Sequence, residues 1–432
     1  MASGARDSYL VIGGSGFLGR HIVEALQARG DVVSVFDIVQ RYHDVPFFGG
    51  DISEEDQVAD ALQKSNATAI IHTASPPAGL SDPALYWKVN VDGTKAVIAA
   101  AQRVGVKKLV YTSSAGVVFN GEDIIDVDER VGFPEKAMDA YNESKAKAER
   151  AVLEANGQNG LLTVALRPAG IFGPGDRQVM AGMVEVYKRN QTHFQIGDNS
   201  NLFDWTYVGN VAHAHLLAAD RLTETLNGTL NLEKVQEEIK TKALPPILKT
   251  TGQLRVPSSD ARPLGPYLYR PDDADEIEGK WQDPTYKPSA DRPLRRSKFD
   301  QFSENSLTHD DSHLSVAGQA FFITNGEPVY FWDFLRAVWY RLDRADGFTR
   351  QEKGRTTFSK SIGMVLAGAA EWWGWLSGKE PTFTRFRVTF TCASRWHNIE
   401  KARRLLGYEP IVGMEEGLDK MVDWYLATQA KA

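Results

Sequence analysis

A tyrosine and a lysine stand at positions i and i+4 of a short polar run, "YNESK" at residues 141–145, inside a stretch with the pattern of an amphipathic helix. Side chains at this spacing lie on one face of a helix, so Tyr141 and Lys145 can share one site. A phenol acts as an acid or base near neutral pH when its pKa falls from about 10, and a neighbouring ammonium lowers that pKa by favouring the phenolate. The pair indicates acid–base chemistry; the alternative is a solvated helix face carrying an incidental Tyr and Lys.

A serine hydroxyl is the third candidate group. Ser114 ends the strand-like run "KKLVYTSS", and parallel strands deliver side chains to a ligand crevice at their carboxyl ends. Beside a nicotinamide cofactor, the three groups form a proton relay for alcohol oxidation. In this scheme Tyr141 accepts the hydroxyl proton, Lys145 lowers the tyrosine pKa and binds the nicotinamide ribose, and Ser114 holds the substrate oxygen. The adjacent Ser113 remains an alternative to Ser114.

The elements that must position these groups alternate along the first half of the chain. Short apolar runs, "YLVIG", "VVSVF", "TAIIHTA", "KKLVYTSS" and "LLTVALRP", are separated by amphipathic stretches from Tyr9 to about Ala219. This pattern is typical of a parallel sheet covered by helices. We therefore predict an α/β fold, a Rossmann-type doubly wound parallel sheet with a smaller, mostly helical C-terminal substrate domain.

A glycine triad follows the first predicted strand. In "VIGGSGFLGRHIVEAL", Gly13, Gly16 and Gly19 lie between a strand and a helix, which allows a tight turn and lets the backbone approach a pyrophosphate at the helix N-terminus. The next strand ends at Asp37, whose carboxylate accepts hydrogen bonds from ribose hydroxyls and repels a 2′-phosphate, so NAD is favoured over NADP. Asp51, placed at the end of the third strand, is expected to reach the adenine.

Composition excludes several classes of protein. The 432-residue chain has a net charge of −7, which argues against nucleic acid as the main partner. Cys392 is the single cysteine, so an internal disulfide and a cysteine-based metal cluster are excluded, and no metal site is expected. The start has no signal-peptide apolar region, and the chain is expected to begin in the cytosol.

The predicted domain boundaries follow from a change in amino-acid composition along the chain. We predict an NAD-binding domain over residues 1–165, with core strands and helices continuing to about 232, and a substrate-binding region over 166–232 and 314–430. Between them, residues 233–313 hold nine of the 19 prolines and little apolar periodicity, which indicates a largely disordered surface insertion.

A tryptophan-rich segment follows the insertion. "SIGMVLAGAAEWWGWLSG", Ser361–Gly378, combines apolar length with three tryptophans at one end and a single charge. Two interpretations stand open: a buried helix lining a pocket, or a helix touching a membrane surface, where tryptophan is favoured.

Several segments together resemble the extended short-chain dehydrogenase/reductases: the glycine triad with Asp37, "VNVDGT", "YTSSAGVVF", "YNESK" and "LRPAGIFGPGD". Within that family, "AGQAFFITNGEPVYFWDF" and "GKEPTFTRFRV" are similar to the 3β-hydroxysteroid dehydrogenase branch. The resemblance implies a supporting role for Asn90 and cofactor contacts from residues 73–75. Further implied cofactor contacts are Ser15, Phe17, Leu18, Ile52, Ala74, Lys145 and Pro168.

The resemblance also implies an activity: NAD-dependent oxidation of the 3β-hydroxyl of a 4α-carboxysterol, with loss of the carboxyl group as CO2, in ergosterol biosynthesis. The implied location is the cytosolic face of the endoplasmic reticulum membrane or a lipid droplet. A sterol substrate, the membrane surface, other sterol C4-demethylation enzymes and a second copy of the chain are the expected partners. The group that meets the substrate carboxylate is not identified; Lys379, Arg385 and Arg387 lie near the expected sterol pocket, where surface arginines are the plainer interpretation.

Two other enzyme functions and one non-enzymatic function compete with this one. A dehydrogenase of a steroid-like secondary metabolite and a sugar-nucleotide epimerase would keep the fold and cofactor. An epimerase needs charged groups for a nucleotide diphosphate, and the apolar, tryptophan-rich C-terminal region disfavours it. An NAD-sensing scaffold would show loss of the relay, whereas Ser114, Tyr141 and Lys145 are all present.

Overall fold

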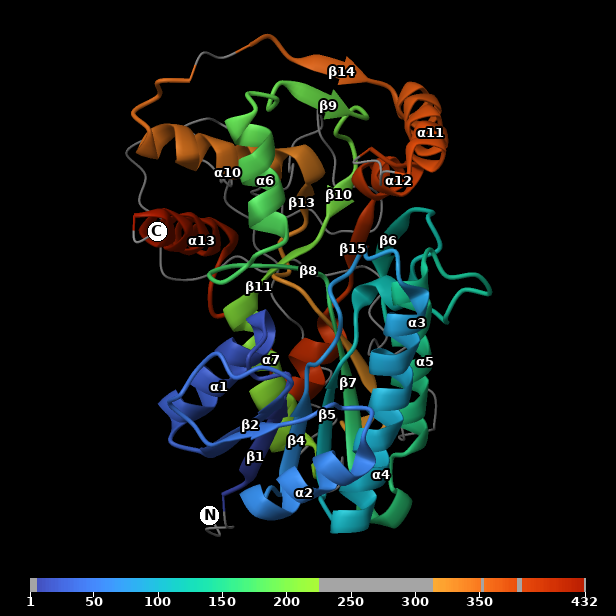
Figure 1. Ribbon diagram of the computed structural model, residues 1–432, viewed down its shortest axis with the longest axis vertical. Helices are drawn as coiled ribbons and strands as arrows, with labels where there is room; N and C mark the ends of the chain where they lie inside the picture. Colours follow the sequence, from blue (N-terminus) through green and yellow to red (C-terminus); the bar gives the residue numbers. More distant parts are fainter. Residues whose placement is uncertain (1–5, 225–313, 351–352, 379–382, 431–432) are drawn as a thin grey trace.

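The computed structural model describes residues 6–224, 314–350, 353–378 and 383–430. Within these ranges the chain forms a large parallel sheet covered by helices, and a second unit of helices and short sheets above its carboxyl edge (Figure 1). The predicted insertion, 233–313, lies outside the described residues.

The large sheet has seven strands, all parallel, in the order β12-β7-β5-β4-β1-β2-β3. Its strands are nearly continuous apolar runs, as expected when both faces are buried. They are β1 (Ser8–Ile12), β2 (Val32–Asp37), β3 (Phe47–Gly49), β4 (Ala69–His72), β5 (Lys108–Thr112), β7 (Leu162–Pro168) and β12 (Ala320–Ile323).

Helices cover the sheet on both faces (Figure 1). On one face, α1 (Phe17–Arg29) packs against α7 (Val208–Arg221); on the other, α4 (Thr94–Val104) packs between α2 (Glu55–Ser65) and α5 (Ala140–Glu154). Alternate residues of each strand supply the two cores, so Val11 packs with α1 while Leu10 and Ile12 pack with α2 and α4. This is the doubly wound α/β fold expected from the sequence.

The last strand of the large sheet comes from late in the chain. β12 pairs with β7 in register from Ala320 opposite Ala165 to Ile323 opposite Pro168. Residues 320–323 fall in the stretch that the sequence analysis assigned to the substrate-binding region, and the structure places them at the sheet edge. The described chain on both sides of residues 225–313 therefore contributes to the same nucleotide-binding unit.

The second unit combines helices with small sheets. Its four-stranded sheet has the order β13-β10-β15-β6, and two further pairs are β11-β8 and β14-β9. The strands are β6 (Ile124–Val127), β8 (Gly170–Phe172), β9 (Phe194–Ile196), β10 (Leu202–Phe203), β11 (Trp205–Tyr207), β13 (Val329–Tyr330), β14 (Thr356–Phe358) and β15 (Arg395–His397). The helices are α6 (Val179–Lys188), α10 (Phe331–Ala345), α11 (Lys360–Ser377), α12 (Arg385–Cys392) and α13 (Met414–Gln429).

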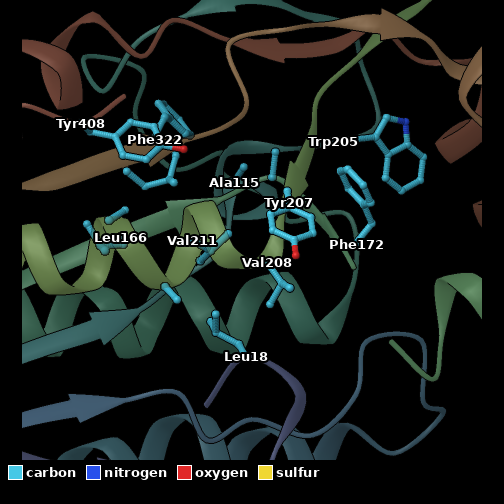
Figure 2. Packing of buried hydrophobic residues seen from close by; sticks show 14 of the residues in the cluster. Leu18, Ala115, Leu166, Phe172, Trp205, Tyr207, Val208, Val211, Phe322 and Tyr408 are labelled. Atoms are coloured by element: carbon cyan, nitrogen blue, oxygen red, sulfur yellow. The ribbon is translucent and has the colours of Figure 1, made fainter. Parts of the chain in front are cut away.

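One apolar core joins the two units. Figure 2 shows Leu18 and Leu166 of the nucleotide-binding unit in the same cluster as Phe172, Trp205 and Tyr207. Trp205 stacks on Phe334 of α10 with ring centroids 4.1 Å apart. The carboxyl ends of the strands thus lie between two bodies that share one core.

Candidate active site

The glycine turn after β1 is shaped for close approach to a ligand. Gly13 has φ +85°, and a Cβ added there would lie 2.7 Å from the Ala74 nitrogen. A Cβ at Gly19 would lie 2.2 Å from the Gly13 carbonyl oxygen. The turn can therefore pack this closely against α1 only when both positions are glycine. Gly16 is the N-cap of α1 and offers no side-chain acceptor to the first-turn amides. This end of α1 fits a pyrophosphate, whose charge the amides can bind.

Asp37 lies at the end of β2, beside that turn. Its Oδ2 accepts a hydrogen bond from the Ser15 backbone N–H (3.0 Å), and its Oδ1 accepts one from the Ile38 N–H (2.8 Å). Sequence reasoning missed Arg41, whose Nη1 donates to the Ser15 carbonyl oxygen at 3.3 Å. An acidic and a basic side chain therefore both lie beside the expected ribose position.

The other predicted cofactor residues lie along the same edge. Asp51 follows β3 by two residues, and hydrogen bonds from Lys88 (2.8 Å) and Ser53 lower its pKa to about 2. Ile52 is buried against Gly93, and Ala74 faces the glycine turn. The remaining members are Phe17 and Leu18, in the first turn of α1, and Pro168, the last residue of β7.

Tyr141 lies in the first turn of α5, behind an N-cap that sequence reasoning did not single out. The Asp139 carboxylate accepts a hydrogen bond from the Asn142 N–H (2.7 Å), as an aspartate ahead of a helix commonly does. The Tyr141 phenol lies close enough to the hydroxyls of Ser75 and Ser114 for both to act on its pKa, and its ring packs edge-on against Tyr86 at 5.5 Å.

The prediction that Lys145 lowers the pKa of the Tyr141 phenol is wrong for the chain by itself. Burial raises the Tyr141 pKa to about 12, Asp139 adds to the rise, and the hydrogen bonds from Ser75 and Ser114 oppose it. Lys145 does not point at the phenol: its Nζ donates to the Thr112 carbonyl oxygen at 2.5 Å and lies 4.4 Å from the centre of the Tyr111 ring. Burial lowers the Lys145 pKa to about 7.

The structure separates the two adjacent serines. Ser113 is buried, and its hydroxyl donates to Glu149 Oε2 at 2.5 Å; Glu149 in turn binds Arg167 through Nε and Nη2. The Ser114 hydroxyl acts on the Tyr141 phenol, and its Oγ accepts a hydrogen bond from the Gly116 N–H (3.0 Å). The geometry favours Ser114 for contact with a substrate oxygen, since Ser113 belongs to a buried ionic network.

Asn90 supports α5 from a π-helical turn, Trp87–Gly93, which follows the short helix α3 (Pro83–Tyr86). Its Nδ2 donates to the Ser144 hydroxyl at 2.9 Å, and that hydroxyl donates to the Tyr141 carbonyl oxygen at 2.8 Å. Its buried Oδ1 has no partner among the described residues. Asn90 thus touches the helix turn that carries Tyr141 and Lys145.

Helix α11 decides between the two interpretations of the tryptophan-rich segment. Trp372, Trp373 and Trp375 are 62%, 63% and 79% exposed, and Val365 and Leu376 on the same helix are also exposed. Gly363, Ala367 and Gly374 alone are buried, because a narrow stripe packs on α12 and Ile196. The interpretation as a buried helix is wrong. Across the described residues, no helix is long and apolar enough to span a membrane.

The basic residues named for the sterol pocket lie on the neighbouring surface. Arg385, at the start of α12, is exposed and binds Glu371 of α11 through Nε at 2.7 Å. Arg387 belongs to the same helix, and Lys379 lies outside the described residues. The Arg385–Glu371 pair therefore joins the two helices at the protein surface.

Comparisons with known proteins agree with the geometry of this site. Residues 10–237 match the model of the 3-beta hydroxysteroid dehydrogenase/isomerase family. The chain is 39% identical to sterol-4-alpha-carboxylate 3-dehydrogenase, decarboxylating, of Schizosaccharomyces pombe, and 38% identical to the protein of that name from Saccharomyces cerevisiae, in each case over 97% of both chains. Among solved structures, it is similar to a Thermus thermophilus UDP-glucose 4-epimerase in complex with NAD, with TM-score 0.55, 20% identity and coverage of 97% and 99%. At that identity the likeness is one of fold.

Proposed function

The chain belongs to the 3-beta hydroxysteroid dehydrogenase/isomerase family, and we propose that it oxidises the 3β-hydroxyl of a 4α-carboxysterol and releases the carboxyl group as CO2 in sterol biosynthesis. The observation that carries the proposal is that the Ser114 hydroxyl acts on the phenol of Tyr141, one helix turn before the buried Lys145. The substrate class is supported by sequence identities of 39% and 38%, over nearly the full length, to two fungal decarboxylating dehydrogenases. The pathway that we propose for this step is ergosterol biosynthesis.

The cofactor is a nicotinamide dinucleotide, and we propose NAD. The glycine turn and the N-terminus of α1 would hold the pyrophosphate, Asp37 the adenosine ribose, and Lys145 the nicotinamide ribose. The oxidised nicotinamide supplies the acceptor for the hydride that leaves C3. Asp37 supports NAD because a 2′-phosphate would be repelled there, although Arg41 reduces that repulsion.

The protein groups then move one proton. As C3 is oxidised, the phenol oxygen of Tyr141 accepts the hydroxyl proton while Ser114 holds the substrate oxygen. The product is a β-keto acid, whose C4–carboxyl bond breaks with its electron pair passing to the ketone oxygen. Ser114 and Tyr141 stabilise the resulting enolate as donors, and its protonation completes the reaction. The step requires no separate decarboxylation base.

Helix α11 supports a place for this reaction at a membrane surface. A carboxysterol partitions into lipid, and exposed tryptophans favour the interface between lipid and water. We therefore place the enzyme peripherally on the cytosolic face of the endoplasmic reticulum membrane or on a lipid droplet. Other enzymes of sterol C4 demethylation are candidate partners there, and homodimerisation remains a further proposal.

The deciding experiment follows two products from one substrate. The protein is incubated with NAD and a 3β-hydroxysterol carrying a ¹⁴C-labelled 4α-carboxyl group, and NADH and labelled CO2 are measured. We expect the two to form in equal amounts. NADH without CO2, or equal oxidation of sterols with and without the carboxyl group, would favour a dehydrogenase of another steroid-like metabolite.

A further inference from the structure

Arg395, the first residue of β15, has a largely buried guanidinium that forms no ion pair with the described residues. Its side chain lies over the rings of Phe119, Phe203 and Phe390, with distances of 4.6, 4.5 and 3.6 Å to the ring centres. Its Nε and Nη2 are buried, and neither has a hydrogen-bond partner among the described residues. A buried charge without a hydrogen-bonded partner is costly, so its presence calls for an explanation.

The unpartnered atoms form the edge with which an arginine binds a carboxylate. Arg167 shows this use elsewhere in the chain: its Nε and Nη2 bind the buried Glu149 at 3.0 and 2.6 Å. Such paired donors recognise the planar carboxylate group in two parallel hydrogen bonds. Arg395 presents the same two donors, surrounded by aromatic rings instead of an acid.

Arg395 lies over the ring of Phe119 at 4.6 Å, and the Phe119 carbonyl oxygen accepts a hydrogen bond from the N–H of Met138, the residue before Asp139. Burial lowers the Arg395 pKa to about 9 and raises the pKa of Asp139, the N-cap of α5, and the charge of each residue opposes the shift of the other. The two side chains form no ion pair within 4.0 Å in the described structure, while the Asp139 carboxylate bonds the Asn142 N–H. Asp139 also acts on the phenol of Tyr141. On the other side, Phe119 follows the 3₁₀ turn Ala115–Val118 that begins after Ser114.

The substrate proposed above carries its hydroxyl and its carboxylate on adjacent ring carbons. A group that binds the carboxylate must therefore lie close to the groups that bind the hydroxyl, Tyr141 and Ser114. We infer that Arg395 binds the C4 carboxylate of the sterol through Nε and Nη2, with the aromatic rings around it contacting the apolar sterol skeleton. The inference rests on the proposed function and names the specificity residue that sequence analysis left open.

The alternative cation is Arg385, which the sequence analysis named. Its side chain is 62% exposed and already binds Glu371 at 2.7 Å. A surface pair of this kind contributes little to recognition, because water screens it. Arg385 therefore serves as the matched control.

The test compares Arg395→Met with Arg385→Met on two substrates, a 4α-carboxysterol and the same 3β-hydroxysterol without the C4 carboxyl group. With NADH formation as the readout, we expect Arg395→Met to lower kcat/KM for the carboxysterol by about 30-fold or more, chiefly through KM, since a charged hydrogen-bond pair is lost. For the sterol without the carboxyl group the change should stay within about 3-fold. Arg385→Met should leave both values unchanged.

Equal losses on both substrates, or an unchanged preference for the carboxysterol, would overturn the assignment of Arg395. If the parent protein itself neither oxidises the carboxysterol nor releases its CO2, the proposed function fails first and the inference with it. Thermal unfolding checks the variant: replacing an unpaired buried cation by Met should not lower stability. Should Arg395→Met fail to fold, Arg395→Lys takes its place, and it should retain part of the preference because it keeps the charge without the paired donors.

Discussion

Ser113 and Ser114 are neighbours in the chain, but their hydroxyls meet different groups: the Ser113 hydroxyl donates to Glu149 at 2.5 Å, while the Ser114 hydroxyl acts on the phenol of Tyr141. Ser114→Ala should therefore lower kcat by about 10²-fold and leave thermal unfolding nearly unchanged. Ser113→Ala should do the reverse, lowering the free energy of unfolding by about 1–3 kcal/mol because a buried carboxylate oxygen loses its donor. An activity loss confined to the Ser113 variant would show that Ser113 is the catalytic serine and that Ser114 is not.

Tyr141→Phe removes the proton acceptor and keeps the ring. We expect kcat to fall by about 10²-fold or more, in line with acid–base contributions, and the affinity for NAD, measured by fluorescence titration, to change little. Tyr86→Phe is the control, since its ring packs on Tyr141 at 5.5 Å while its hydroxyl donates to the Pro77 carbonyl oxygen. Near-normal turnover by the Tyr141 variant would rule out the assignment.

Lys145→Met tests the cost of burying an ammonium. Burial lowers the Lys145 pKa from 10.5 to about 7, so between these pH values the unfolded chain binds more protons than the folded one, and stability rises with pH. The free-energy cost of burying the charged ammonium is fully present below pH 7 and disappears as the pH rises toward 10.5. The inactive variant should therefore be more stable than the parent by a few kcal/mol at pH 6.5, as each pKa unit is worth about 1.4 kcal/mol. Denaturant unfolding should show the gap narrowing by pH 9.5; a gap independent of pH would contradict this cause.

We propose that Asp37 and Arg41 set the choice between NAD and NADP. Asp37→Ser removes the carboxylate and leaves Arg41 free to meet a 2′-phosphate, so kcat/KM for NADP relative to NAD should rise by about 10-fold or more. The double variant Asp37→Ser, Arg41→Ala should lose most of that gain. If the parent already uses both cofactors equally, Asp37 does not exclude the phosphate.

The exposed tryptophans of α11 should hold the protein on membranes. Changing Trp372, Trp373 and Trp375 to Ser should reduce sedimentation with phospholipid vesicles and leave NAD binding intact. The matched control changes three exposed apolar residues elsewhere, Val32, Phe348 and Ile411, to Ser.

Equal loss of vesicle binding in both triple variants would show general hydrophobicity instead of a local attachment. A parent protein that never sediments with vesicles would remove the support that α11 gives to the membrane location. Misfolding of the tryptophan variant would show that α11 contributes to the folded core.

Much of the nucleotide-binding unit could be predicted because its signals are local. Apolar runs buried on both faces indicate parallel strands, and two of the three glycines, Gly13 and Gly19, stand where a Cβ would clash with the backbone. The spacing of Tyr141 and Lys145 likewise follows from helix geometry. Strand β12 was harder to assign, since it joins the sheet from beyond residues 225–313.

By itself the sequence determined the fold class, the dinucleotide turn and the residue types of the relay, because each depends on short-range pattern. Only the tertiary structure decided which serine meets Tyr141, that burial raises the Tyr141 pKa, and that the α11 tryptophans face outward. It also brought Arg395 within electrostatic reach of Asp139, which is far away in the chain. Burial, desolvation and contacts between distant segments have no local signature, since they depend on what the rest of the chain packs against each side chain.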